Sequence, residues 1–538
     1  MKKSILLIFF HFILFTAISQ SLPRPKLVIG MVVDQMRWDY LYKFYDRYGN
    51  GGFRRLLREG FSCDNTFIPY VPTVTAAGHS CVYTGSVPAL TGIIGNNWYD
   101  REQKQVVYCT DDNSVHTVGS NSQAGEMSPR KLWSNTVTDE LRLATNFRNK
   151  TVAIALKDRA AILPGGHTAN GSFWFDNGSG GWISSSFYMN DLPDWVKNFN
   201  SRKLPDTYMK QDWNTMFPIS TYVQSIADSN IYEGSIPGED NSFPHRTSTI
   251  SSNKYEAFRT TPFGNTFTFD IARAAIEGEA LGKNGLTDFL ALSFSSTDYI
   301  GHTFGPNSVE VEDMYLRFDK DLSDFLQYLD KEIGQGQYLV FLTADHGAAH
   351  NPQFVLDKKM PAGAMNLGAI ARQINDSLQK KFGLAGIILQ YMNYQFYLDR
   401  QRMQQNSVDE EKVKDYIIQM LLKQDGVSQV VDLSQINNSG LNEKLKFMLV
   451  NGYNQKLSGD LEVIFKPQWF ESMQRGTTHG LWNPYDAHIP LLWFGWNVNP
   501  GHLYREVYMT DIAATLSAML HIQMPNACVG KVIEEVAR

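Results

Sequence analysis

Short runs of apolar, often β-branched residues recur along the chain and predict buried strands. A run that is apolar at nearly every position is typical of a strand covered on both faces, as in a sheet between two layers of helices. Five such runs are residues 26–36 (KLVIGMVVDQM), 151–159 (TVAIALKDR), 288–298 (DFLALSFSSTD), 338–347 (YLVFLTADHG) and 489–497 (IPLLWFGWN).

Between these runs the apolar positions follow a helical period, most clearly over residues 311–329. Acidic residues lie at the N-terminal end of this segment, where a helix favours negative charge. The apolar positions, spaced by three or four, are Val311, Met314, Phe318, Leu322, Phe325 and Leu329. The alternation of strands and helices predicts an α/β fold with a mostly parallel central sheet and helices on both faces.

Two regions interrupt this alternation. Residues 170–260 are rich in Ser, Asn, Gly, Trp and Tyr and show weak periodicity. Residues 351–474 contain strand-like and helical pieces of their own, such as GIILQYMNYQFYL and EEKVKDYIIQMLLKQ. We expect both regions to be insertions that cap one edge of the sheet.

The N-terminal segment MKKSILLIFFHFILFTAISQS has the pattern of a secretory signal peptide. Two lysines precede an apolar run, and small residues end it near Ser19. The alternative is a membrane anchor, but the run is short against the about 20 apolar residues that a spanning helix needs. We therefore expect cleavage after residues 1–19 and a periplasmic or secreted protein without a membrane anchor.

Charge and cysteine content change this picture only slightly. A net charge of −6 at pH 7 argues against nucleic acid as the main partner, because binding a phosphate backbone needs a basic face. The four cysteines, Cys63, Cys81, Cys109 and Cys528, allow alternative disulfide pairings in an exported protein. Buried thiols and structural bridges both fit the sequence, and the pairing stays open.

Carboxylates and imidazoles follow several of the predicted strands. The carboxyl ends of parallel strands meet at one edge of a sheet, where ligands bind, and Asp and His are ligands that zinc takes. Each residue alone would be explained more simply as a cap, a turn or a satisfied polar group. Together they predict a metal site made from Asp34, Asp298, His302, Asp345, His346 and His479.

The local spacing of these residues supports that prediction. Asp298 and His302 are four residues apart, so one helical turn places both on one face. Asp345 and His346 are adjacent, and Gly347 allows the sharp turn that brings both to one ion. Two metal ions about 4 Å apart clamp the attacking and leaving oxygens of a phosphoryl displacement.

Thr75, in the segment VPTVTAAGHS, stands where a helix is predicted to begin. A helix N-terminus suits phosphate and stabilises a negatively charged oxygen. A metal ion beside the hydroxyl would lower its pKa and make it a nucleophile. The alternative role is that of a helix N-cap, a common place for threonine.

Three further residues are candidates for phosphate binding. Lys157 and Arg159 end a predicted strand two positions apart, which places both on one face. Asn96, in GIIGNNWYD, has an amide that would donate to a phosphate oxygen. The alternatives are a solvated basic strand end for the pair and a turn for the asparagine.

These motifs resemble the alkaline phosphatase superfamily, and most of all the bacterial, phosphate-irrepressible alkaline phosphatases that use a threonine nucleophile. The resemblance runs over nearly the whole chain after the signal segment. The ten residues that carry it, in family order, are Asp34, Thr75, Asn96, Lys157, Arg159, Asp298, His302, Asp345, His346 and His479.

The resemblance implies one catalytic domain over residues 20–538, a monomer, and two Zn²⁺ ions. One ion would be held by Asp298, His302 and His479, and the other by Asp34, Asp345, His346 and Thr75. In that family the threonine forms a phosphothreonine while hydrolysing small-molecule phosphate monoesters to inorganic phosphate. Asn96, Lys157 and Arg159 would bind the non-bridging oxygens.

Two alternatives to this alkaline phosphatase activity stay open. A phosphodiesterase or nucleotide pyrophosphatase of the same superfamily uses the same nucleophile and metals. A non-catalytic exported protein that binds zinc or phosphate would need no nucleophile. Lys157 and Arg159 favour the monoester reading, because two fixed cations reward the extra charge of a dianion.

Overall fold

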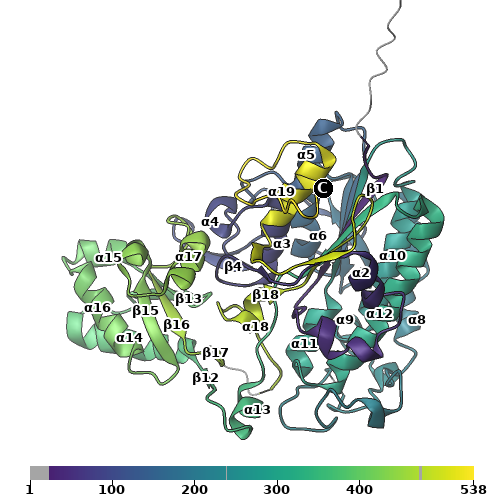
Figure 1. Ribbon diagram of the computed structural model, residues 1–538. Coiled ribbons are helices and arrows are strands. Elements are labelled where there is room, and N and C mark those ends of the chain that lie inside the picture. Colours follow the sequence, from purple (N-terminus) through teal and green to yellow (C-terminus); the bar gives the residue numbers. More distant parts are fainter. Residues whose placement is uncertain (1–22, 238, 472–474, 538) are drawn as a thin grey trace, which may run out of the picture.

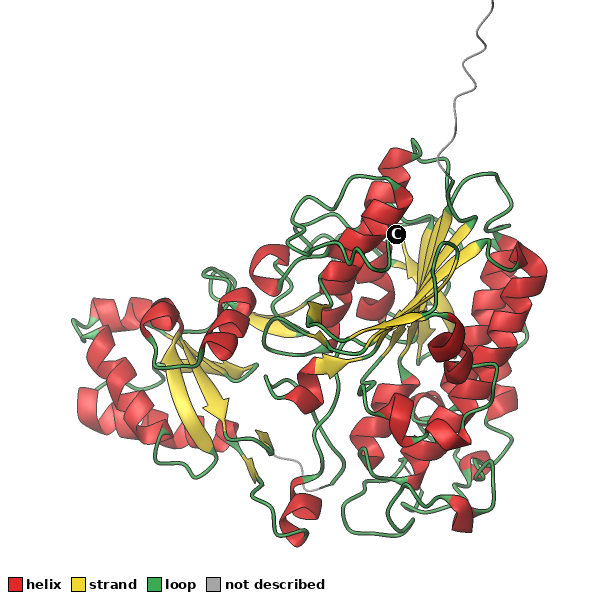
Figure 2. Ribbon diagram, in the orientation of Figure 1, coloured by secondary structure: helices red, strands yellow, loops and turns green. Residues whose placement is uncertain are grey.

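The structure is a computed structural model that describes residues 23–237, 239–471 and 475–537. Its centre is a ten-stranded sheet (Figures 1 and 2) in the order β20-β2-β19-β11-β1-β10-β7-β8-β9-β6. The strands are β1 (Leu27–Val33), β2 (Phe61–Cys63), β6 (Thr117–Val118), β7 (Thr151–Ala155), β8 (Gly171–Asp176), β9 (Gly181–Ser185), β10 (Asp288–Phe294), β11 (Tyr338–Thr343), β19 (Leu491–Gly495) and β20 (Gly501–Leu503). All five predicted strands are present.

The middle of the sheet is parallel, and antiparallel strands adjoin it on both sides. Strands β11, β1, β10, β7 and β8 run parallel to one another. On one side β19 pairs antiparallel with β11, and on the other β9 pairs antiparallel with β8. The mostly parallel sheet is thus confirmed. Since β1 lies between β10 and β11, the ends of three site-bearing strands are immediate neighbours.

Helices cover both faces of the sheet, as predicted (Figure 1). One layer contains α3 (Thr75–Thr84), α5 (Val137–Ala144), α6 (Asp158–Gly165) and α19 (Asp511–Leu520). The other contains α2 (Phe53–Glu59), α10 (Phe263–Gly278) and α12 (Val309–Leu329). Helix α12 corresponds to the helix predicted from the apolar period and begins two residues earlier, where Ser308 accepts a hydrogen bond from the Val311 N–H as its N-cap.

The first expected insertion begins later than residue 170. Gly171–Asp176 and Gly181–Ser185 form strands of the main sheet, because their aromatic side chains, among them Phe173, Trp174 and Trp182, are buried there. The rest of the region has little regular structure. It comprises loops, short 3₁₀ turns and the helices α7 (Asp194–Ser201), α8 (Leu204–Tyr208) and α9 (Lys254–Arg259).

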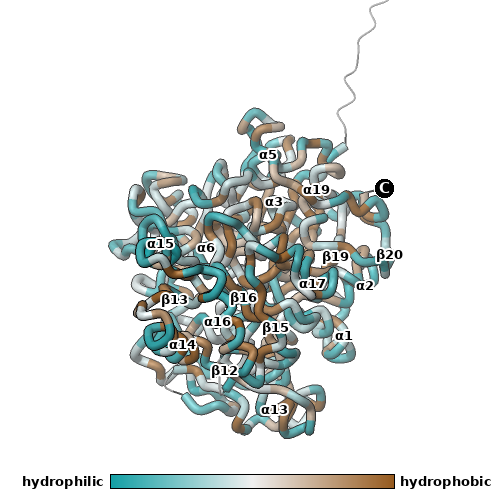
Figure 3. Tube along the Cα trace, turned by 90° about the vertical axis from the view of Figure 1, so that its left-hand side faces the viewer, coloured by the Kyte–Doolittle hydropathy of each residue, from teal (hydrophilic) through white to brown (hydrophobic). Residues whose placement is uncertain are grey.

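The second region, residues 351–471, has a sheet and a core of its own, and we call it the cap. Its antiparallel sheet has the order β13-β14-β16-β15, and Figure 3 shows hydrophobic residues along β15 and β16. The elements are α13 (Pro352–Asp357), β12 (Gly363–Met365), α14 (Leu367–Phe382), β13 (Ile388–Met392), β14 (Gln395–Leu398), α15 (Arg400–Gln405), α16 (Glu410–Leu421), β15 (Val427–Asp432), α17 (Glu443–Gly452), β16 (Leu461–Phe465) and β17 (Trp469–Glu471).

The predictions on the signal segment, the membrane anchor and the cysteines concern the export of the protein. The predicted signal segment, residues 1–19, lies outside the described residues. Among the residues that are described, no helix combines the length and apolarity needed to cross a membrane. All four cysteines are free thiols, three of them buried and Cys528 partly exposed.

Candidate active site

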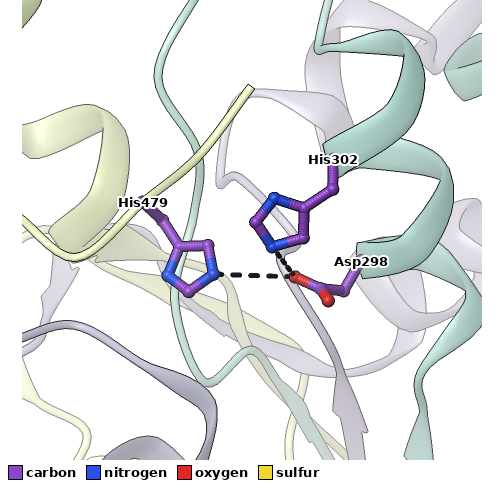
Figure 4. A group of neighbouring side chains, drawn as sticks. All are labelled: Asp298, His302 and His479. Carbon is purple, nitrogen blue, oxygen red and sulfur yellow. Dashed lines mark ion pairs between the residues drawn. The ribbon is translucent and has the colours of Figure 1, made fainter. Parts of the chain in front are cut away.

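Two groups of potential metal ligands lie at the carboxyl end of the parallel strands. Asp298, His302 and His479 form the first group (Figure 4), and Asp34, Asp345 and His346 form the second. Within each group the ligand atoms lie within 4.8 Å of one another. Asp298 and His302 share one face of α11 (Ser296–Phe304), as the four-residue spacing predicts, while His479 arrives from the chain after the cap.

Each histidine is held in one orientation by a backbone carbonyl. The Nδ1 atoms of His302, His346 and His479 lie 2.8, 3.0 and 2.8 Å from the carbonyl oxygens of Thr477, Gly347 and Thr73. A ring whose Nδ1–H donates to a carbonyl keeps its Nε2 lone pair for a metal. In the first group both Nε2 atoms face Asp298 Oδ1, at 3.2 Å from His302 and 3.7 Å from His479.

The second group is fully buried and carries excess negative charge. Burial and then the Asp345 carboxylate raise the pKa of Asp34 well above its usual value, against the opposing effect of Lys157. Asp34 Oδ1 and Asp345 Oδ2 accept no hydrogen bond from any described residue. Buried carboxylate oxygens without donors, beside the Nε2 of His346, are the donor set that a divalent cation such as zinc satisfies.

The two groups touch through their histidines. The rings of His346 and His479 are stacked, with centroids 3.5 Å apart and planes 12° from parallel. Lys157 also joins the groups, since its Nζ lies 2.7 Å from Asp34 Oδ2 and 2.6 Å from Asp298 Oδ2. The sequence-predicted ligands therefore form one continuous site.

Thr75 is the first residue of the buried helix α3. The N-cap position belongs to Val74, and no side chain caps this helix, so the alternative role of Thr75 as the cap is wrong. Its Oγ1 lies 3.5 Å from His346 Nε2, the atom that faces the second group. The hydroxyl thus combines a helix N-terminus with a neighbouring metal-ligand set, which favours a negatively charged oxygen.

Helix α3 packs against the end of β11 at very short range. A Cβ on Gly78 would lie 2.5 Å from Asp345 Cβ, so only glycine allows this approach. One turn after Thr75, His79 Nδ1 lies 2.9 Å from the Thr75 carbonyl oxygen and 3.3 Å from Asp345 Oδ2. His79 was not among the predicted site residues, although it belongs to the same sequence motif.

Lys157 and Arg159 are not on a strand, contrary to the sequence prediction. Strand β7 ends at Ala155, Lys157 is the N-cap residue of α6, and Arg159 lies in its first turn. The two-residue period of a strand is therefore not what places the two cations on one face. The start of α6 brings them to the same end of the sheet, because the chain turns at the carboxyl end of β7.

Arg159 and Asn96 both have donors free for an anion. Arg159 Nη1 donates to Tyr108 Oη at 3.0 Å, while its buried Nε donates to no described residue. Asn96 Oδ1 accepts a hydrogen bond of 2.9 Å from the Ala76 N–H, which is next to Thr75. Because the oxygen is occupied, the amide nitrogen is the free end. Tyr108 and its contact with Arg159 gave no sequence signal, since 51 positions separate them.

The chain matches the family model described as type I phosphodiesterase / nucleotide pyrophosphatase over residues 28–486. Alkaline phosphatase PhoV of Synechococcus elongatus is 52% identical to it over 96% of this chain and 94% of the relative. A protein of Myroides odoratus that carries the name calcium-transporting ATPase is 51% identical over 96% of this chain and 95% of its own.

Solved structures give the same picture of the fold. The crystal structure of wild-type alkaline phosphatase PafA superimposes with a TM-score of 0.94 and 48% identity, covering 96% of this chain and 100% of that one. PafA of Elizabethkingia meningoseptica is also found by sequence, at 48% identity over 96% of this chain. A murine ectonucleotide pyrophosphatase / phosphodiesterase 5 shares the fold at 13% identity, with a TM-score of 0.53 over 92% of this chain and 95% of that one.

Proposed function

The chain belongs to the type I phosphodiesterase / nucleotide pyrophosphatase family, and we propose that within this family it is an alkaline phosphatase that hydrolyses phosphate monoesters. The proposal rests on the position of Thr75, whose buried hydroxyl stands at a helix N-terminus beside two adjoining metal-ligand groups. Near full-length similarity to PhoV and PafA, both named alkaline phosphatases, supports it.

In the first step Thr75 Oγ attacks phosphorus, and the bond from phosphorus to the leaving oxygen breaks. This forms a phosphothreonine and releases the leaving oxygen as an alcohol, which takes up through solvent the proton that the Thr75 hydroxyl gives up. Two zinc ions, one held by Asp298, His302 and His479 and one by Asp34, Asp345 and His346, would supply positive charge to the leaving and attacking oxygens. In the second step water attacks phosphorus, the bond from phosphorus to Thr75 Oγ breaks, a proton of the water returns to Thr75, and inorganic phosphate is released.

The side chains around Thr75 would hold the phosphoryl group during both steps. The amide nitrogen of Asn96, the guanidinium of Arg159 and the ammonium of Lys157 would bind its non-bridging oxygens, which the free Asn96 amide nitrogen and the unpaired Arg159 Nε support. A crystallised PafA variant replaces a threonine, an asparagine, a lysine and an arginine. The spacing within the first two and within the last two equals that of Thr75 to Asn96 and of Lys157 to Arg159.

The choice between monoester and diester depends on charge. A monoester dianion gains more from Lys157 and Arg159 than a diester monoanion does, because Coulomb stabilisation scales with the charge of the ligand. The first experiment is kcat/KM for an aryl phosphate and for its methyl diester on zinc-loaded protein. We expect a strong preference for the monoester, and a preference for the diester would move the protein to the phosphodiesterase activity that the family's description also covers.

Substitution of Arg159 sharpens this test. Arg159→Gln should lower kcat/KM for the monoester by about 10²-fold, the scale seen when one oxyanion-stabilising donor is lost. The loss for the diester should be much smaller. A matched control is Arg58→Gln, which removes a half-exposed arginine from α2 on the opposite layer. Equal losses for both substrates would contradict the monoester assignment.

Export to the periplasm or medium and a monomeric state complete the proposal. They are supported by the signal-like N-terminal sequence and by the likeness to the bacterial phosphatases. N-terminal sequencing of protein recovered outside the cytoplasm and sedimentation analysis test them directly.

A further inference from the structure

Gln35 lies between the two metal-ligand groups and contacts both of them. It follows Asp34 at the carboxyl end of β1, and only 3% of it is exposed. Its backbone N–H donates to Asp345 Oδ1 of the second group at 3.1 Å. Its side-chain Nε2 donates to Asp298 Oδ1 of the first group at 2.6 Å. We propose that Gln35 is a positioning residue that fixes the first metal site relative to the second.

The backbone of Gln35 is held in a conformation that its side chain does not favour. Its φ is 65°, in the left-handed region that non-glycine residues rarely adopt. Such a conformation costs free energy and persists where surrounding contacts require it, most often at functional sites. Here the backbone N–H and the side-chain amide of one residue reach two carboxylates, Asp345 after β11 and Asp298 on α11.

The surface opposite Gln35 is shaped to receive its amide. A Cβ on Gly301 would overlap Gln35 Oε1. Gly301 lies on α11 between Asp298 and His302, so the amide fits against the helix that carries two ligands of the first group. Asp298 Oδ1, which accepts from Gln35, is also the atom that the Nε2 atoms of His302 and His479 face. The amide therefore orients the carboxylate oxygen at the centre of this group.

This inference rests on the proposed function, because it assumes that both groups bind a metal. Outer contacts that orient a ligand typically change metal affinity about 10- to 100-fold when removed. Gln35→Leu keeps the bulk of the side chain but deletes the amide donor. It should weaken zinc binding to the first group by that factor and leave the second group within about threefold, because the backbone N–H to Asp345 remains.

The test measures zinc affinity by competition with a chelator, one group at a time. In an Asp345→Asn background the first group is read alone, and in a His302→Ala background the second. Adding Gln35→Leu should weaken binding in the first background only. Gln401→Leu, at an exposed position in the cap, is the matched control for loss of a glutamine amide. Turnover of Gln35→Leu should recover as free zinc is raised, as a positioning role requires.

Gln35→Gly separates the side chain from the backbone. Glycine adopts the positive φ without strain, so this variant keeps the backbone N–H to Asp345 and loses the whole side chain with its amide. It should bind zinc in the first group as weakly as Gln35→Leu does. Wild-type affinity in either variant would overturn the positioning role. A wild-type protein that binds no zinc would instead refute the proposed function itself.

Discussion

Two buried clusters of carboxylates and histidines in this protein handle their charge in opposite ways. The first is the candidate active site. The other cluster, which we call the acid cluster, consists of Glu233, His245 and Glu310. All three residues are fully buried, and His245 Nε2 lies 3.0 Å from Glu310 Oε1. Both contain carboxylates and histidines, residue types that bind metals, yet the two clusters differ in the positive charge beside their carboxylates.

The active site is supplied with positive charge and hydrogen-bond donors. Burial would raise the pKa of Asp298, but His302 and Lys157 hold it well below its usual value. Among the described residues, no lysine or arginine forms an ion pair with Glu233 or Glu310. Burial, and then the charge of Glu310, raise the pKa of Glu233 to about 10. Neighbouring cations and histidines thus keep Asp298 of the active site ionised, whereas burial keeps Glu233 of the acid cluster neutral.

The largest effect should come from replacing Thr75, the proposed nucleophile of the active site. Thr75→Ala should lower kcat by at least about 10³-fold, because loss of a nucleophile removes the covalent route. Its zinc content should stay at the wild-type level, since two full ligand groups remain. Steady-state kinetics and metal analysis of the same preparation check both points. Retained turnover would show that another group attacks phosphorus.

The zinc content of two matched variants tests the difference between the two clusters directly. Asp345→Asn should cost the second group its ion, because a neutral amide replaces a charged ligand that is fully buried. Glu310→Gln, the equivalent change in the acid cluster, should leave the zinc content unchanged. Elemental analysis after dialysis measures both. Loss of zinc from Glu310→Gln would show that the acid cluster also holds zinc, which would contradict the difference between the clusters.

The smallest expected effect is on stability as a function of pH. The pKa of Glu233 is raised from 4.5 in the unfolded chain to about 10 in the folded protein, so between these values the folded state holds the extra proton. The stability from Glu233 is therefore complete below about pH 4.5 and is lost as the pH rises, by at most about 1.4 kcal/mol per pH unit. Glu233→Gln should flatten this decline and raise Tm at pH 9 more than at pH 5. Parallel melting curves for the two proteins would contradict it.

Strands, the long helix and the residues of the active site were predictable because each leaves a local pattern. Apolar runs located β1, β7, β10, β11 and β19. The direction of β19 was not predictable, because an antiparallel return depends on where the chain re-enters the sheet after the cap. Strands β8 and β9 were missed because glycine and serine interrupt their apolar positions.

The residues that support the active site were harder to find than those that form it. Lys157 and Arg159 were identified by type, but a turn just after β7 replaced the expected strand geometry. One feature of the sequence indicates Gln35, namely its position directly after Asp34. No such feature indicates Glu233, since Glu310, the charge that most affects it, lies on α12, far away in sequence. Long-range contacts of this kind have no periodic signature in the chain.

The chain order of the two ligand groups sets the order in which a ribosome makes them. Asp34, Asp345 and His346 have all been synthesised before the first residue of the cap. His479, which the first group needs, is translated only after the whole cap, whose core is its own. A nascent chain therefore holds one complete ligand set and one unfinished set throughout the synthesis of the cap.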